Sequence, residues 1–113
     1  MAINVNMSRK DIINAKNSSV NIKEAIANNW ELIVSGVAVV DNGGTSKSGE
    51  PCGIGYIATD KGIFGFTSNV LLNSIGDLAD YLADTLDSGE VIKIKFNSRL
   101  SKSGSEFYTM TII

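Results

Sequence analysis

The chain of 113 residues contains no histidine and has one cysteine, one proline and one tryptophan. Without histidine, no Ser–His or Cys–His nucleophilic system can form, and the usual proton shuttle near neutral pH is missing. The single cysteine, Cys52, excludes an internal disulfide, and a zinc site lacks ligands. We therefore expect a protein that is not an enzyme and holds no metal or cofactor. Cys52 is interpreted as a small, buried or half-buried residue.

Long apolar runs are also absent. The hydrophobic residues make up 43% of the chain but lie in short patterned runs, none near the roughly 18 residues that a membrane span needs. The N-terminus lacks the basic and then apolar pattern of a signal region. The sequence therefore predicts one globular domain over residues 1–113, located in the cytoplasm, with no membrane partner.

Five short runs have the composition or the two-residue period of strands. They are Glu31–Asp41, Cys52–Thr59, Ile63–Phe66, the run around Ile92, Ile94 and Phe96, and Phe107–Ile113. The cluster Asn42-Gly43-Gly44 predicts a turn after the first run, and Asp60-Lys61-Gly62 predicts a tight hairpin.

Between the third and fourth runs the period changes to that of an amphipathic helix. It covers Asn69–Thr85, with Ser68 as the expected N-cap. Asp77, Asp80 and Asp84 of the helix, and Asp87 just after it, are expected mostly on the polar side. The polar N-terminal segment, residues 1–29, predicts a turn led by Ser8 and a short helix over Ile22–Asn28 that packs on the domain. Trp30 is then expected at the junction, as a core anchor.

This order of elements predicts an all-β protein, an OB-like five-stranded barrel with a helix between the third and fourth strands and an N-terminal helical extension. In such barrels a face centred on the second and third strands, flanked by two hairpin loops, binds single-stranded nucleic acid or oligosaccharide.

The tetrapeptide Ser-Lys-Ser-Gly occurs in both of those predicted loops, at Ser46–Gly49 and Ser101–Gly104. Lys47 and Lys102 would offer ammonium groups to phosphates, although Ser, Lys and Gly are also ordinary hairpin residues. The net charge of −2 conceals an asymmetry, because Asn69–Asp87 holds four Asp and no cation. Residues 91–105 hold no acid and four cations, Lys93, Lys95, Arg99 and Lys102. Such an asymmetry indicates a polyanion site or two solvated faces.

A face that binds single strands also needs aromatic rings on which bases stack. The candidates are Tyr56, Phe64, Phe66, Phe107 and Tyr108. Each of them could instead fill the core. Alternation along the last strand favours Phe107 as an outward residue, with Thr109 and Thr111, and places Tyr108 with Met110 and Ile112.

The stretch from Gly36 to Ile113 resembles small phage-encoded single-stranded-DNA-binding proteins. The resemblance rests on four segments and the helix between the last two. The segments are Val-Ala-Val-Val-Asp-Asn, Ser-Gly-Glu-Pro, Ile-Gly-Tyr-Ile-Ala-Thr-Asp-Lys-Gly and Lys-Ser-Gly-Ser-Glu-Phe-Tyr. It implies an OB-like viral protein that coats single strands during phage DNA replication. By position, it assigns nucleic-acid contacts to Lys47, Tyr56, Phe64, Phe66, Lys93, Lys95, Arg99, Lys102, Phe107 and Tyr108.

The expected function is therefore single-stranded DNA binding without sequence preference. Replication proteins and a second copy of the chain, paired through the last strand, are further candidate partners. The alternative is a small phage or mobile-element inhibitor, a protein-interaction module that uses the acidic face of the predicted helix.

Overall fold

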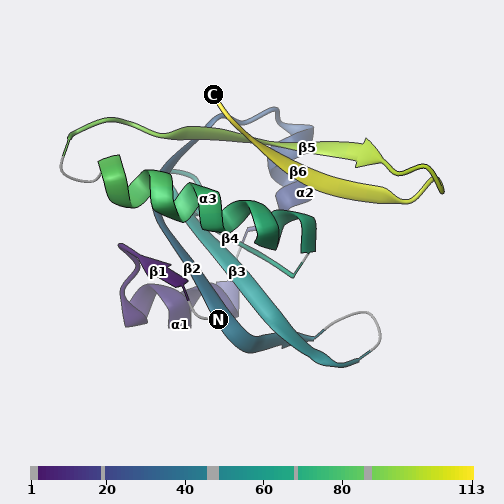
Figure 1. Cartoon of the computed structure of the whole chain (residues 1–113), viewed down its shortest axis with the longest axis horizontal. Coiled ribbons are helices and arrows are strands. Elements are labelled where there is room, and N and C mark those ends of the chain that lie inside the picture. The colour runs from purple at the N-terminus through teal and green to yellow at the C-terminus, as the bar shows by residue number, and fades with distance from the viewer. Residues whose placement is uncertain (1–2, 19, 46–48, 68, 86–87) are drawn as a thin grey trace.

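The strand-forming segments pair into one antiparallel sheet of six strands (Figure 1). The computed structural model describes residues 3–18, 20–45, 49–67, 69–85 and 88–113. Within them the strands are β1 (Ile3–Val5), β2 (Leu32–Thr45), β3 (Pro51–Thr59), β4 (Gly62–Phe66), β5 (Lys93–Leu100) and β6 (Glu106–Ile112). The helices are α1 (Arg9–Ser18), α2 (Ile22–Ala27) and α3 (Asn69–Thr85). The sheet order is β4-β3-β2-β5-β6, and β1 also pairs with β2.

The long strand β2 connects the two halves of the sheet. Its first residues, Leu32 and Ile33, pair with β5, whereas most of the remainder pairs with β3. The turn predicted at Asn42-Gly43-Gly44 is wrong, because β2 continues to Thr45, which lies opposite Pro51. A shift of register between Val40 and Gly44 absorbs the extra residues of that segment.

The predicted hairpin between β3 and β4 is confirmed. Thr59 pairs with Gly62 across Asp60 and Lys61, and the Thr59 hydroxyl donates to the Gly62 carbonyl at 2.8 Å. Gly62 has a φ of 125°, a conformation that side chains with a Cβ rarely adopt. The turn therefore follows directly from local chemistry.

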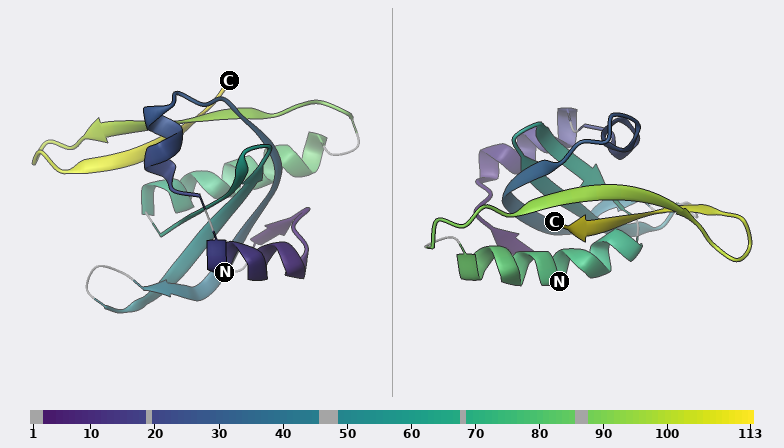
Figure 2. Two further views of the ribbon diagram at one scale, coloured as in Figure 1. Left: turned by 180° about the vertical axis from the view of Figure 1, so that it is seen from behind. Right: turned by 90° about the horizontal axis from the view of Figure 1, so that it is seen from above.

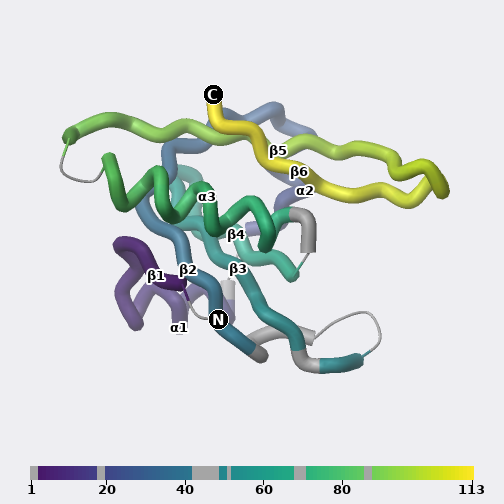
Figure 3. The backbone as a smooth tube through the Cα atoms, in the orientation of Figure 1, coloured from purple at the N-terminus to yellow at the C-terminus, as the bar shows by residue number. Residues whose placement is uncertain are grey.

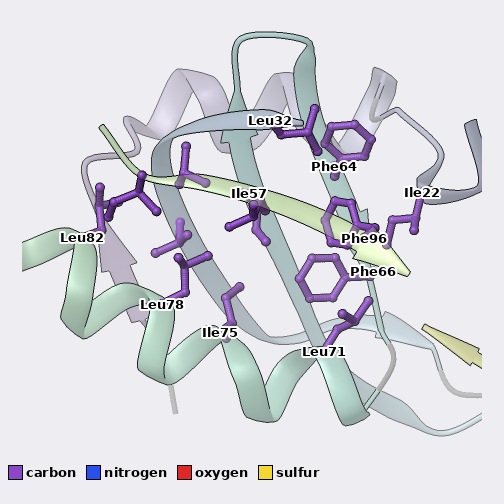
Figure 4. Packing of buried hydrophobic residues seen from close by; sticks show 14 of the residues in the cluster. Ile22, Leu32, Ile57, Phe64, Phe66, Leu71, Ile75, Leu78, Leu82 and Phe96 are labelled. Carbon is purple, nitrogen blue, oxygen red and sulfur yellow. The ribbon is translucent and has the colours of Figure 1, made fainter. Parts of the chain in front are cut away.

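Helices cover both faces of the β2–β4 half of the sheet (Figure 2). On one face, α2 and α3 enclose the main core, in which Phe64 and Phe96 lie with ring centroids 5.4 Å apart (Figure 4). On the other face, α1 and Met7 cover a second cluster that includes Tyr56. Gly55 allows the close packing in the main core, because a Cβ there would lie 2.6 Å from Phe66 Cε2.

The OB-like barrel is wrong, and so is the all-β class. The protein has an α/β fold with an open sheet, and no pairing joins β4 to β6 in the described residues. The N-terminal segment occupies the position that closure would need. Val20 N donates to the Ile63 carbonyl at 2.8 Å on the free edge of β4, and Asn21 and Ile22 line a cavity together with the end of β4 and Tyr108 of β6.

The N-terminal segment is more structured than the sequence suggested. The helix predicted over Ile22–Asn28 is confirmed as α2, but β1 and α1 were not predicted. Ser8 and Asp11 begin α1 with a reciprocal cap: Asp11 N donates to Ser8 Oγ at 3.1 Å, and Ser8 N donates to Asp11 Oδ2 at 3.2 Å. Trp30 packs against the main core as expected, and Cys52 is half-buried. None of the described helices is long and apolar enough to cross a membrane.

Candidate nucleic-acid interface

The hairpin formed by β5 and β6 has one apolar face and one polar face. Ile94 and Phe96 are buried in the main core, so the residues between them point away from it. The pairing brings Lys95 opposite Thr111, Asn97 opposite Thr109 and Arg99 opposite Phe107. We call this outward surface the basic face. It comprises Lys93, Lys95, Asn97 and Arg99 from β5 and Phe107, Thr109 and Thr111 from β6.

The cations of the basic face are available for a ligand. Lys93 and Arg99 are exposed and Lys95 is half-buried. In the described part of the chain, no carboxylate forms an ion pair with any of the three. Glu106 belongs to the same hairpin but lies on the opposite face, where it accepts a hydrogen bond from the Tyr108 hydroxyl at 3.0 Å. In the right-hand view of Figure 2 the hairpin lies nearest the viewer, with its outer surface forward.

The two aromatic residues of β6 lie on different faces. Phe107 is half-buried on the basic face, across from Arg99, as the alternation predicted. Tyr108 is half-buried on the inner face, where it packs against the main core. Burial, together with the hydrogen bond to Glu106 and the charge of that carboxylate, raises the pKa of Tyr108. Of this pair, only Phe107 has the position of a stacking platform.

The other aromatic candidates are wrong as stacking platforms. Tyr56, Phe64 and Phe66 are only 1%, 0% and 7% exposed. Their burial has a simple cause: α3 covers the face of β4 that carries the two phenylalanines, and α1 covers the face of β3 that carries Tyr56. A base cannot reach a ring that is enclosed between a sheet and a helix.

Of the two loops that contain Ser-Lys-Ser-Gly, the structure describes Ser101–Gly104 in full but only Gly49 of Ser46–Gly49. Lys47 lies outside the described residues. Lys102 is exposed at the tip of the β5–β6 hairpin, beyond the basic face. The serines beside it serve the turn itself, because Ser101 Oγ and Ser103 Oγ lie 2.9 Å apart and Ser101 N donates to the Ser105 carbonyl at 2.8 Å. The Lys102 ammonium is therefore the main group that the hairpin tip presents to a ligand, because the serine hydroxyls are engaged within the turn.

Sequence reasoning missed Asn97. It lies between Lys95 and Arg99 on the basic face, and its Nδ2 donates to Thr111 Oγ1 at 3.0 Å. Beside it, Thr109 Oγ1 is buried and has no hydrogen-bond partner in the described residues. The same two-residue alternation that assigned the lysines would have placed Asn97 here, since it occupies the position between two outward cations.

A groove lies under the opposite, inner face of the hairpin. One cavity of about 290 Å³ is lined by Lys23 and Ile26 of α2 and by Ser98, Glu106 and Tyr108 of the hairpin. A second, of about 220 Å³, lies between Tyr108 and the end of β4. In the first cavity the Tyr108 hydroxyl and Glu106 are already hydrogen-bonded to each other, so the basic face remains the stronger site.

Searches of protein-family models, curated proteins and solved structures find no match to this chain.

Proposed function

We propose that the protein binds single-stranded DNA without sequence preference, along the basic face of the β5–β6 hairpin. One observation carries the proposal: Lys93, Lys95 and Arg99 line one side of a strand, with an aromatic ring opposite Arg99 and no acidic residue on that face. Successive outward residues on a strand lie about 6.6 Å apart, twice the rise per residue. A flexible single strand can place its phosphates along such a row.

The chemistry of binding follows from these side chains. The lysines and Arg99 contact phosphates and release condensed counterions, so affinity falls steeply with salt. Asn97 and Thr111 donate hydrogen bonds to phosphate or sugar oxygens. Phe107 stacks against one base, which a duplex cannot offer because its bases are already stacked. The resemblance to phage single-stranded-DNA-binding proteins supports a role in coating strands during phage replication.

The test is a titration of the purified protein with fluorescent oligo-dT of about 30 nucleotides, at low and at physiological salt, with a duplex as control. The double variant Lys95→Ala/Arg99→Ala should reduce the slope of log affinity against log salt by about two. The matched control, Lys10→Ala/Lys16→Ala, removes the same charge from exposed positions of α1 and should leave the slope unchanged. Equal slopes for both variants, or no binding at low salt, would contradict the proposal.

A second candidate is the protein-interaction module. It is favoured by the exposed side of α3, where Asp77, Asp80 and Asp84 surround Tyr81, whose side chain is 40% exposed. Replacing the three aspartates with alanine separates the candidates. If the triple variant loses the protein's biological activity, the protein-interaction module is favoured. If its affinity for oligo-dT is unchanged or higher, the DNA-binding proposal is favoured.

A further inference from the structure

Exposed aliphatic side chains meet around Lys93, at the start of β5. Ile33 of β2 is paired directly with Lys93, and on the other side Ile113 N donates to the Lys93 carbonyl at 2.9 Å. Residues that lie directly opposite each other share one face of a sheet, so Ile33 and Ile113 flank Lys93 on its outward side. Val91 lies two residues before Lys93, and Ile92 between them is buried. Because facing alternates along an extended chain, Val91 points outward as well.

These three side chains form an apolar patch beside the cations of the basic face. Val91 is 61% exposed, Ile113 60% and Ile33 40%. A single exposed aliphatic residue is ordinary, but apolar side chains that meet on neighbouring strands are typical of an interaction surface. We call Ile33, Val91 and Ile113 the aliphatic end. In Figure 3 the end of the chain, marked C, lies beside β5 at the top of the molecule.

The charge next to the aliphatic end favours a polyanion as its ligand. Lys93 lies at its centre, and Lys95 and Arg99 continue the outward row along β5. The Asp60 carboxylate accepts a hydrogen bond from Ile33 N at 3.0 Å, and Asp60 N donates to the Ile33 carbonyl at 3.1 Å. Both backbone groups of one residue point to the same side of a strand, so Asp60 lies on the side of β2 away from β5. The aliphatic end thus joins an apolar surface to a row of cations, as a nucleic-acid strand with exposed bases requires.

We propose that the aliphatic end is a thymine subsite of the DNA-binding surface. The methyl group of the base packs among Ile33, Val91 and Ile113, and Lys93 binds an adjacent phosphate. Thymine is the only one of the four DNA bases that carries a methyl group, and contact between this group and apolar side chains is a general mode of base recognition. Uracil lacks the methyl group, so the subsite favours DNA over RNA. The inference rests on the proposed function, because the strand must first bind to the basic face.

The subsite adds a small preference to binding that otherwise tolerates any sequence. Removal of one methyl group from water strengthens binding about fourfold. The cations contact all phosphates alike and Phe107 stacks on any base, so these groups contribute most of the affinity. A strand without thymine therefore still binds, but about fourfold more weakly.

Matched oligonucleotides test the methyl contact. Oligo-dT and oligo-dU of about 12 nucleotides differ only in the methyl group of the base, and the unaltered protein should bind oligo-dT about fourfold more tightly. Val91→Ser/Ile113→Ser should abolish this difference and leave the salt dependence unchanged, because it removes the two most exposed side chains of the subsite and no charge. The matched control Ile13→Ser changes an isoleucine of α1 that is 53% exposed, and it should keep the difference.

The fold of the variants is checked by urea denaturation. Exposed side chains contribute little to the free energy of unfolding, so the double variant and the control should both keep the urea midpoint of the unaltered protein. The single variant Ile113→Ser is a second test with a smaller structural change, and it should reduce the preference for oligo-dT over oligo-dU.

Equal affinity of the unaltered protein for oligo-dT and oligo-dU would overturn the thymine subsite and leave the proposed function intact. A difference that persists in Val91→Ser/Ile113→Ser would do the same. Absence of oligo-dT binding at low salt would contradict the proposed function together with the subsite. Sedimentation velocity without DNA examines a second copy of the chain as the other occupant. A dimer of the unaltered protein that becomes a monomer in the double variant would assign the aliphatic end to self-association and reject the subsite.

Discussion

The two halves of the sheet differ in how many of their faces are covered. In the β2–β4 half, α3 packs on one face and α1 on the other, so aromatic residues on either side of the strands are buried. In the β5–β6 half, only the inner face packs on the core, and the outer one keeps three cations and Phe107. The same residue types therefore serve stability in one half and are available for binding in the other. Four changes test this contrast.

Phe64→Ala should have the largest effect, on stability. Phe64 is fully buried against Phe96, and truncation of a buried phenylalanine lowers the free energy of unfolding by about 3–5 kcal/mol. Urea denaturation measures this loss, and oligo-dT affinity per folded molecule should not change. A loss below about 1 kcal/mol would mean that the β2–β4 half is not the packed half of the protein.

Phe107→Ala is the matched change in the other half. It should alter the free energy of unfolding by about 1 kcal/mol or less, because the ring lies on the uncovered face. Loss of one stacked base should weaken oligo-dT binding by roughly 5- to 150-fold, corresponding to about 1–3 kcal/mol. Unchanged binding in the anisotropy titration would remove Phe107 from the interface.

Tyr56→Phe examines the face under α1. The Tyr56 hydroxyl is buried without a hydrogen-bond partner in the described residues, so its removal should stabilise the protein by about 1 kcal/mol at pH 7. Burial also raises the pKa of Tyr56 above its ordinary value of 10.0. The folded state therefore favours the protonated Tyr56 hydroxyl. The contribution of this group to the free energy of unfolding is fully present below about pH 10 and is lost as the pH rises further. Urea midpoints between pH 8 and 11 should fall less for Tyr56→Phe than for the unaltered protein, and an equal fall would argue against this burial.

Asp80→Ala/Asp84→Ala should have the smallest effect. These residues lie four apart on α3 and repel each other, and Asp84 stands in the last turn, where the helix dipole disfavours negative charge. Their removal should raise the free energy of unfolding by a few tenths of a kcal/mol in thermal denaturation. Asp11→Ala, at the start of α1, is the control and should be destabilising, because Asp11 caps that helix. A destabilised Asp80→Ala/Asp84→Ala variant would indicate a structural role for these carboxylates.

Local chemistry made some elements predictable. The amphipathic period gave the bounds of α3, the Asp60-Lys61-Gly62 turn gave the β3–β4 hairpin, and alternation assigned Phe107 to the outer face of β6. The segment before Val20 was harder to interpret. Its asparagines weaken any local helix signal, so α1 depends on packing against the sheet, although Ser8 and Asp11 were a usable cap signal.

The residues of the candidate site also differed in how well the sequence predicted them. Alternation along one strand is a property of the backbone, so the outward row of Lys93, Lys95 and Arg99 could be predicted without knowing the fold. Whether an aromatic strand face is covered depends on segments far away in the chain. Tyr56 was assigned to a binding face because α1, which covers it, had not been predicted.

The sequence by itself determined the order of the last five strands and the long helix, the basic character of the β5–β6 hairpin and the absence of histidine chemistry, because these depend on composition and short periods. Only the tertiary structure decided that the sheet stays open and that β2–β4 is covered on both faces. Both outcomes come from contacts between distant segments, in which Val20 occupies the edge of β4 and α1 packs on Tyr56. Burial of apolar surface between segments that are far apart in the sequence drives these contacts, so no local sequence pattern predicts them.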